Sequence, residues 1–367
     1  MKRTVGSMPP LSTNTVDQIT RAIEPPSELW RQRARLHLDT LTKPIGSLGR
    51  LEDLAAQIVS IRQERFAEQL NKGVYVFAAD HGITAEGVSA YPREVTHQMV
   101  LNFLAQGAAV NVLASVHHVN LRVIDVGVDA DFDDTSDLLH HKVARGTRNM
   151  LHEAAMTDEQ LARALAIGAD VADGAVAAGH TMIAIGEMGI GNTTSASAIT
   201  CALINATASE ATGQGTGVGP EAYSRKVSVV QTIVNKHFGD SSSDSSPLEI
   251  LRCVGGLEIA AMAGMILAAA RHKLVIVADG FISTAAAALA VAVAPAVQGY
   301  LIAGHQSEEP GHKLLLNHLK LVPVLTLNMR LGEGTGAVLA MPILESALAL
   351  YTQMATFTSA GVSGASR

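Results

Sequence analysis

Two glutamates in glycine-rich segments are the strongest candidates for chemistry in this sequence. Glu187 lies in the segment GEMG and Glu333 in the segment GEGTG, and each stands beside an apolar, β-branched run. A carboxylate is costly to bury without partners, so a glutamate at a ligand crevice more often serves as a base or a ribose ligand than as packing. The glycines let the backbone approach a ligand closely. The alternative is a pair of loop glutamates that face water.

A glycine-rich segment after Glu187 has the features of an anion site. The stretch from Gly189 to Ser195 follows an apolar run and opens a helical pattern, where free N–H groups and the helix dipole favour a phosphate. It differs from the dinucleotide fingerprint because Thr194 stands where the third glycine belongs, and from a P-loop because no Lys-Ser/Thr pair follows. A tight strand-to-helix turn with threonine caps is the alternative interpretation.

A second glycine-rich segment could add a cation to that site. Residues 213–219 lead into Pro220 at the expected first position of a helix, which puts Arg225 and Lys226 in the second helical turn. From there a cation could reach a phosphate on the neighbouring loop. Helix charges that face water are the alternative.

The histidines do not form a metal-binding motif. The chain has 14 of them, but there is no His-Glu-x-x-His pattern, no paired cysteines, and the doublets at 117–118 and 140–141 have no carboxylate at ligand spacing. We therefore expect no metal site. If a metal site were nevertheless present, the best alternative function would be that of a metal-dependent hydrolase. Its site residues would be Asp80, His81, Asp279 and His305.

Short buried strands must position these residues. Six apolar, β-branched runs occur at 74–80, 121–127, 181–187, 274–280, 299–304 and 323–328, and they are apolar on both faces, as parallel strands are. Segments with helical character separate most of them, including 96–116 and 157–178, the latter with a capping box at Thr157 and Gln160. The pattern predicts an α/β fold with a doubly wound, mostly parallel sheet of about six strands, whose ligand crevice lies beyond the carboxyl ends of the strands.

The ends of the chain form a different part of the molecule. Helical patterns at 26–40 and 48–69 have no strand between them, and a final helix is predicted over 341–354. We expect a flexible tail over 1–15, a small helical subdomain formed by 16–70 with 341–367, and a Rossmann-like catalytic domain over 71–340. The serine-rich run at 240–246 is expected to be a mobile surface loop.

Composition excludes several classes of protein. Of 367 residues, 27 are Lys or Arg and 34 are Asp or Glu, without a basic cluster, so a nucleic-acid partner is not expected. Two cysteines, Cys201 and Cys253, are too few for a disulfide framework, which is consistent with the reducing environment of the cytoplasm.

Neither a secretory signal nor a membrane span is predicted. No apolar stretch follows the basic residues at the start of the sequence, as a secretory signal requires. Residues 280–304 carry no charge, but Pro295 and Gly299 divide them, which favours a buried helix that leads into a buried strand over a membrane span.

Six segments together resemble one enzyme family. They are similar, in order, to segments of the nicotinate-nucleotide:dimethylbenzimidazole phosphoribosyltransferases, which make the lower ligand of cobalamin. The resemblance covers roughly residues 40–360, and the departures, the tail over 1–15 and the serine-rich loop, lie outside the segments. The segments are LTKPIGSLGRL (41–51), DHGITAEGVSAYP (80–92), GEMGIGNTT (186–194), ADGF (278–281), GHQSEEPGH (304–312) and RLGEGTGA (330–337).

The resemblance implies a reaction and a set of site residues. The reaction moves the 5-phosphoribosyl group from nicotinate mononucleotide to 5,6-dimethylbenzimidazole, giving α-ribazole 5′-phosphate and nicotinate with inversion at C1′. It also implies a homodimer that uses neither a metal nor an organic cofactor, and Glu333 as the general base. The expected substrate-binding residues are Ser89, Tyr91, Gln98, Glu187, Gly189, Gly191, Asn192, Thr193, Lys226, Asp279, Ser307, Arg330, Leu331 and Gly332.

The chemistry is consistent with a single catalytic carboxylate. Nicotinate leaves a pyridinium-type bond as a neutral ring nitrogen, so no acid is needed, while the second N–H of the attacking base becomes acidic. Two alternatives stay open: the metal-dependent hydrolase and a nucleotide-binding regulator without catalytic activity. The sequence does not identify the natural acceptor base.

Overall fold

The computed structural model describes residues 16–17, 20, 23–63, 70–133, 135, 137–215, 217, 219–239 and 245–363. The predicted tail over 1–15 and most of the serine-rich loop lie outside these residues. The described chain contains one sheet of six parallel strands in the order β3-β2-β1-β4-β5-β6. The strands are β1 (Lys72–Ala79), β2 (Asn120–Gly127), β3 (Leu138–His140), β4 (Met182–Met188), β5 (Val275–Ala278) and β6 (Leu301–Ala303).

The strand order places a crevice in the middle of the sheet. The chain passes from β1 outward through β2 to β3 and then returns to β4, on the other side of β1. In doubly wound sheets, this reversal opens a ligand-binding crevice at the carboxyl ends of the two central strands. Those ends lie side by side, because Ala78 of β1 pairs with Met188 of β4.

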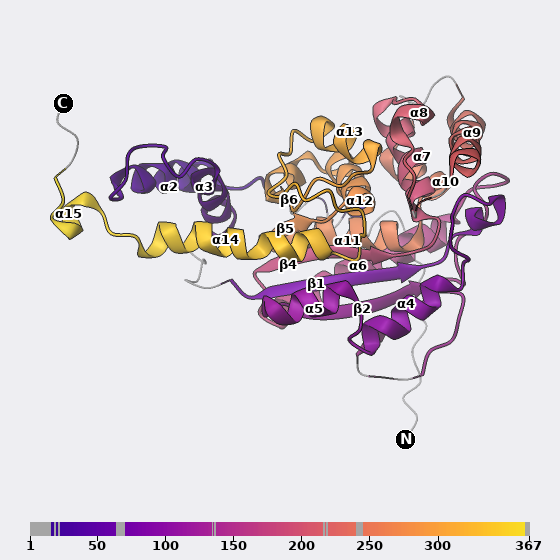
Figure 1. Ribbon diagram of the computed structural model, residues 1–367, viewed down its shortest axis with the longest axis horizontal. Helices are drawn as coiled ribbons and strands as arrows, with labels where there is room; N and C mark the ends of the chain where they lie inside the picture. The colour runs from indigo at the N-terminus through magenta and orange to yellow at the C-terminus, as the bar shows by residue number, and fades with distance from the viewer. Residues whose placement is uncertain are drawn as a thin grey trace.

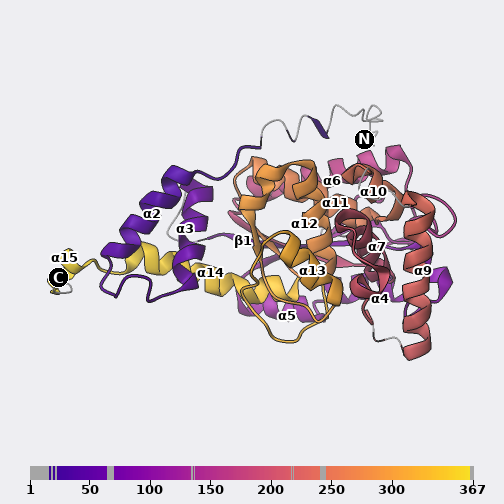
Figure 2. The ribbon, with the colours of Figure 1, turned by 90° about the horizontal axis from the view of Figure 1, so that it is seen from above.

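Helices cover both faces of the sheet, which explains why the central strands are apolar throughout. All eight residues of β1 are buried. Figure 2 shows α6 and α11 on one side of β1, and α4, α5 and α14 on the other. The helices between β1 and β6 are α4 (Val95–Leu104), α5 (Ala109–Val116), α6 (Asp158–Ala177), α7 (Asn192–Ile204), α8 (Ala208–Ala211), α9 (Pro220–Phe238), α10 (Pro247–Val254), α11 (Leu257–Arg271) and α12 (Phe281–Val293), with 3-10 turns η2 (Gly82–Glu86) and η4 (Pro295–Tyr300).

The terminal helices lie together at one end of the molecule. Helices α2 (Glu28–Thr40) and α3 (Arg50–Arg62) pack against the long helix α14 (Thr335–Gln353), whose other end contacts the sheet (Figure 1). A bridge between Leu41 and Thr356 closes this end, which also holds α15 (Phe357–Ala360). The predicted boundary between residues 340 and 341 falls inside α14, and the division into a catalytic domain and a helical subdomain stays a prediction.

Three predicted elements differ from the structure. Residues 323–328 form no strand. A single bridge joins His305 and Leu325, and the guanidinium group of Arg50 donates hydrogen bonds to the carbonyl groups of residues 322 and 323. The short strand β3 was not predicted. The predicted helix over 96–116 is two helices, because Gln106 has a left-handed φ of 60° between α4 and α5. The helix predicted over 341–354 is α14, which begins earlier, at Thr335, and α13 (Pro310–His318) precedes it.

The apolar segment over 280–304 has the predicted organisation. It forms α12, a 3-10 turn and then β6, and the strand is fully buried. Two other stretches, Val95–Val116 and Thr335–Gln353, have the length and hydropathy of a membrane span. The first is broken into two short helices, and half of the apolar window of the second is buried in the fold. Core helices commonly have this composition.

Candidate active site

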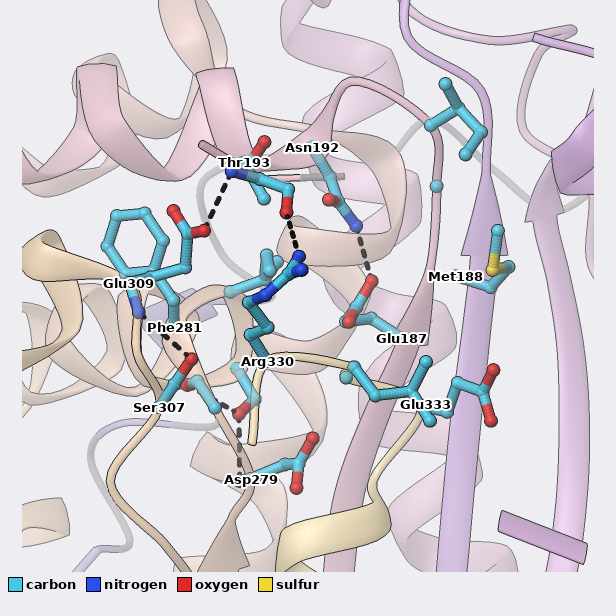
Figure 3. A pocket seen from close by; sticks show the side chains of 18 of the residues that line it. Glu187, Met188, Asn192, Thr193, Asp279, Phe281, Ser307, Glu309, Arg330 and Glu333 are labelled. Carbon is cyan, nitrogen blue, oxygen red and sulfur yellow. Dashed lines mark hydrogen bonds between the residues drawn. The ribbon is translucent and has the colours of Figure 1, made fainter. Parts of the chain in front are cut away.

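A cavity of about 490 Å³ opens at the carboxyl edge of the sheet, beside the reversal in strand order. This volume is typical of a site for a small molecule. Its walls come from the ends of β4 and β5, from α4, and from the loops after β6 and before α14 (Figure 3). The polar side chains that line it are Tyr91, Glu187, Asn192, Thr193, Asp279, Ser283, His305, Ser307, Glu309, Arg330 and Glu333.

Glu187 is a buried carboxyl group at the end of β4. Its side chain accepts a hydrogen bond from the amide of Asn192, in the first turn of α7. Burial, together with the nearby carboxylates of Glu258, Asp279 and Glu333, raises the pKa of Glu187 to about 8. The group therefore holds a proton at neutral pH and can donate a hydrogen bond to a ligand.

Glu333 is held in an unusual backbone conformation. Gly332, Glu333 and Gly334 all have left-handed φ values, of 86°, 63° and 91°. A side chain in this region is strained, and such residues persist only where the surroundings fix them. The carboxylate of Glu333 accepts a 3.5 Å hydrogen bond from Val110 N–H at the start of α5, and burial raises its pKa. Glu333 is only 5% exposed.

Asp279 holds the loop that carries Glu333, just before α14. Its two carboxylate oxygens accept hydrogen bonds from the N–H groups of Gly334, at 3.1 Å, and Ala337, at 2.9 Å. Burial raises the pKa of Asp279, while His305, 3.7 Å away, opposes the shift. Because both oxygens are engaged by the start of α14, Asp279 holds the backbone that carries Glu333.

A polar corner of the cavity surrounds the start of α7. Lys226 of α9 is fully buried, and its Nζ donates to Thr193 Oγ1 at 2.9 Å and to the Gly213 carbonyl at 3.2 Å. Burial lowers the pKa of Lys226 to about 8, which Glu309 partly opposes. On the facing loop, the Ser307 hydroxyl accepts from Glu309 N–H at 3.3 Å. Thr193 thus links the ammonium group to the cavity.

Apolar side chains line the rest of the cavity. Val95 and Met99 are one turn apart on α4, and Tyr91 and Leu331 are each 55% exposed at the rim. The other apolar side chains of the lining are Met188, Ile190, Phe281 and Ile282. This wall suits a flat, mostly apolar ring.

Most of the residues predicted for the site lie on the cavity wall. Four predicted residues do not line it: Ser89, Gly191, Gln98 and Lys226. Gln98, which the resemblance implied, is exposed on α4, whereas its neighbour Met99 lines the cavity, and a role for Gln98 in binding stays a prediction. The lining residues that were not predicted include Val95, Met99, Phe281, Ser283 and Glu309, and His305 was expected only for the metal-dependent hydrolase. Glu309 follows β6 in the segment GHQSEEPGH, so its place after a strand was the signal that could have found it.

The four residues of the metal-hydrolase alternative are divided between two places: Asp279 and His305 lie 3.7 Å apart on the cavity wall, whereas Asp80 and His81 do not line the cavity. Asp80 accepts from Asp129 N–H and pairs with Arg93, while His81 contacts Glu258. Within the described part of the chain, no three His, Cys, Asp or Glu side chains are grouped as metal ligands.

A pair of buried carboxyl groups with raised pKa values, beside a small-molecule cavity in a doubly wound sheet, defines an enzyme that acts on a small ligand. A sequence profile described as phosphoribosyltransferase matches residues 23–362. The chain belongs to this phosphoribosyltransferase family.

Relatives and solved structures agree with the profile. The chain is 48% identical over 336 residues to the nicotinate-nucleotide–dimethylbenzimidazole phosphoribosyltransferase of Geobacter sulfurreducens, covering 92% of this chain and 94% of the relative. It is 49% identical to the enzyme of that name from Chloroflexus aurantiacus, covering 90% and 93%. The crystal structure of CobT from Thermus thermophilus superposes with a TM-score of 0.87 at 47% identity, covering 91% of this chain and 99% of that one. The α/β fold with a parallel sheet is therefore confirmed.

Proposed function

We propose that this phosphoribosyltransferase transfers the 5-phosphoribosyl group of nicotinate mononucleotide to 5,6-dimethylbenzimidazole, as the names of its relatives indicate. The products are α-ribazole 5′-phosphate and nicotinate. The observation that carries the proposal is the buried carboxylate of Glu333, fixed in a left-handed loop at the edge of a cavity of about 490 Å³. That volume accommodates a mononucleotide beside a second ring.

The reaction needs one proton acceptor. A benzimidazole nitrogen attacks C1′, the bond from C1′ to the pyridinium nitrogen breaks, and its electron pair neutralises the departing ring. The proton on the other benzimidazole nitrogen passes to Glu333. A raised pKa suits this role, because a base whose pKa lies nearer the working pH accepts a proton more readily in the transition state. Attack from the face opposite nicotinate inverts C1′.

The other groups orient the two substrates. We assign the phosphate to the corner formed by Gly189, Thr193 and Ser307, with the charge of Lys226 behind Thr193. Glu187, protonated at neutral pH, donates to the ribose side of the nucleotide. The attacking ring lies against Tyr91, Met99 and Leu331. Binding both rings on a rigid sheet edge supplies the proximity that such a displacement requires.

The remaining features of the proposal concern partners and location. We propose a homodimer in the cytoplasm, without a nucleic-acid or membrane partner. Large apolar side chains exposed at the end distant from the cavity, Leu29 and Leu36 of α2 and Ile45, support a protein contact there. Cys201 and Cys253 are both free and buried, which suits a reducing compartment.

Two rival functions are separated by simple experiments. We expect activity to survive exhaustive EDTA treatment, because the leaving group needs no Lewis acid. Loss of activity that one added metal restores would instead support the hydrolase. A regulator without catalytic activity would bind the mononucleotide tightly and release no nicotinate.

The direct test is a nicotinate-release assay with a panel of acceptor bases. We expect release that depends on both the mononucleotide and the base, with formation of the α-anomer. Release at an equal rate without any base would show hydrolysis and contradict the proposal.

A further inference from the structure

A buried group of three polar side chains lies outside the cavity, and the mechanism above does not use it. His81 follows β1, and its Nε2 lies 2.6 Å from Glu258 Oε1 of α11. Its other ring nitrogen, Nδ1, lies 3.1 Å from Ser195 Oγ of α7. All three residues are 0% exposed. The ring is therefore held from two sides, by the Glu258 carboxyl group and by the Ser195 hydroxyl, whose oxygen also lies 3.4 Å from the Gly255 carbonyl oxygen.

The same residue types form hydrolytic triads, but this group cannot act as one. None of the three lines the cavity, and Ser195 has no access to a substrate. A buried carboxylate such as Glu258 is nevertheless costly, particularly because its Oε2 has no hydrogen-bond partner among the described residues. Its presence therefore calls for an explanation other than packing.

The His81 ring lies directly beneath the loop at the start of α7. A Cβ on Gly189 would stand 3.3 Å from both Cδ2 and Nε2 of His81, and one on Gly191 would stand 3.3 Å from its Cβ. The nearest atoms would be the Ala79 carbonyl oxygen at 2.6 Å for Gly189 and Thr84 Cγ2 at 2.9 Å for Gly191, so the His81 side chain packs against both glycines together with these two residues. The loop between them leads to Asn192 and Thr193, which line the cavity, and Asn192 donates to Glu187. A displacement of the ring would move these cavity groups.

We propose that His81 and Glu258 are positioning residues, which act through the Gly189–Gly191 loop to set the mononucleotide site. Glu258 orients the ring from α11, Ser195 orients it from α7, and the ring supports the loop. The inference rests on the proposed function insofar as the ligand is the mononucleotide. The support of the loop by the ring does not depend on that assignment.

The test compares two substitutions of the same residue. Glu258→Gln keeps an oxygen that can accept from His81 Nε2, whereas Glu258→Leu does not. Both remove the charge that raises the pKa of Glu187, so any effect through that charge is equal in the two variants. We expect the dissociation constant for nicotinate mononucleotide, measured by calorimetry, to be about tenfold higher in Glu258→Leu than in Glu258→Gln. Affinity for dimethylbenzimidazole should be the same in both.

A stability control separates positioning from general weakening. Ile266 is fully buried on the same helix, roughly 12 Å further along at 1.5 Å per residue. Ile266→Ala should lower the melting temperature without changing mononucleotide affinity. If Ile266→Ala weakens binding as much as Glu258→Leu at a matched loss of stability, the positioning role is excluded. Equal dissociation constants for the two Glu258 variants would also overturn it.

A second variant covers failure of Glu258→Leu to fold. Ser195→Ala removes the contact to His81 Nδ1, together with the longer contacts to the Gly255 carbonyl and Met150 Sδ, and leaves Glu258 in place. It should raise the dissociation constant about threefold, and an unchanged value would contradict the proposal. Crystal structures of the variants test the inference independently of the ligand. The Gly189–Gly191 loop should be displaced in Ser195→Ala and Glu258→Leu and unmoved in Glu258→Gln. A wild-type protein that does not bind the mononucleotide would overturn the proposed function, whereas an unmoved loop in all variants would overturn this inference.

Discussion

The carbonyl group of Glu333 lies against the α-carbon of Gly186. A Cβ on Gly186 would stand 2.5 Å from the Glu333 oxygen, closer than such contacts occur. The loop that carries Glu333, the proposed general base, can therefore pack this closely on strand β4 only because Gly186 has no side chain. The contact ties the loop that carries Glu333 to the strand that carries Glu187.

The contact between Gly186 and the Glu333 carbonyl group predicts that adding one methyl group at residue 186 impairs catalysis. Gly186→Ala should push the Glu333 loop away from β4 and lower turnover by about 10²-fold, the usual cost of a misplacement of about 1 Å. Mononucleotide affinity should change much less. Ala184→Gly, on the same face of β4, is the control: it should reduce stability but keep turnover. Steady-state kinetics with both substrates decide the matter, and normal turnover by Gly186→Ala would contradict the assigned contact.

Lys226 provides a test of the phosphate corner. Lys226→Met keeps the length of the side chain but removes the charge behind Thr193, so the Michaelis constant for the mononucleotide should rise about 10- to 100-fold. The constant for the base should not change. Arg225→Met, an exposed neighbour on α9, should behave as the wild type. An equal rise in the Michaelis constants of both substrates in Lys226→Met would contradict the assignment of the phosphate to this corner.

The raised pKa of Glu187 predicts how stability depends on pH. The group titrates near 4.5 when exposed in the unfolded chain and near 8 in the folded protein. Between these values only the folded state keeps the proton, so the free energy of unfolding falls as pH rises, by up to about 1.4 kcal/mol per pH unit. Glu187→Gln should flatten this slope in urea titrations, and Glu153→Gln, at the surface, should not. An unchanged slope in Glu187→Gln would mean that Glu187 titrates normally.

The strands could be predicted where burial on both faces requires a continuous apolar run in the sequence. Strands β1, β2, β4, β5 and β6 all overlap the predicted apolar runs, with ends that differ by one or more residues, because parallel strands covered by helices are apolar on both faces. The three-residue strand β3 leaves no such run. The run at 323–328 resembles a strand, but the side chain of Arg50, from a helix far away in the sequence, binds the carbonyl groups at its start.

The site was predictable to the extent that glycines and carboxylates follow strands. Glu187, Asn192 and Glu333 were found this way, and all line the cavity. Gln98 was implied by the family resemblance alone, and a resemblance does not give the rotation of α4, which turns Met99 toward the cavity and leaves Gln98 exposed. Lys226 was expected near this loop from its place in the second turn of its helix, and its contact with Thr193 depends in addition on how α9 packs on α7.

The most direct test of the mechanism is the turnover number of Glu333→Gln with dimethylbenzimidazole, beside that of Glu187→Gln. Glutamine keeps the size of the side chain but cannot accept a proton, so Glu333→Gln should lose roughly 10²- to 10⁴-fold in turnover with nearly unchanged mononucleotide affinity. Glu187→Gln should keep most of its activity, because Glu187 is already protonated at neutral pH. Turnover near the wild-type value in Glu333→Gln, with an inactive Glu187→Gln, would contradict the account and assign the base to Glu187.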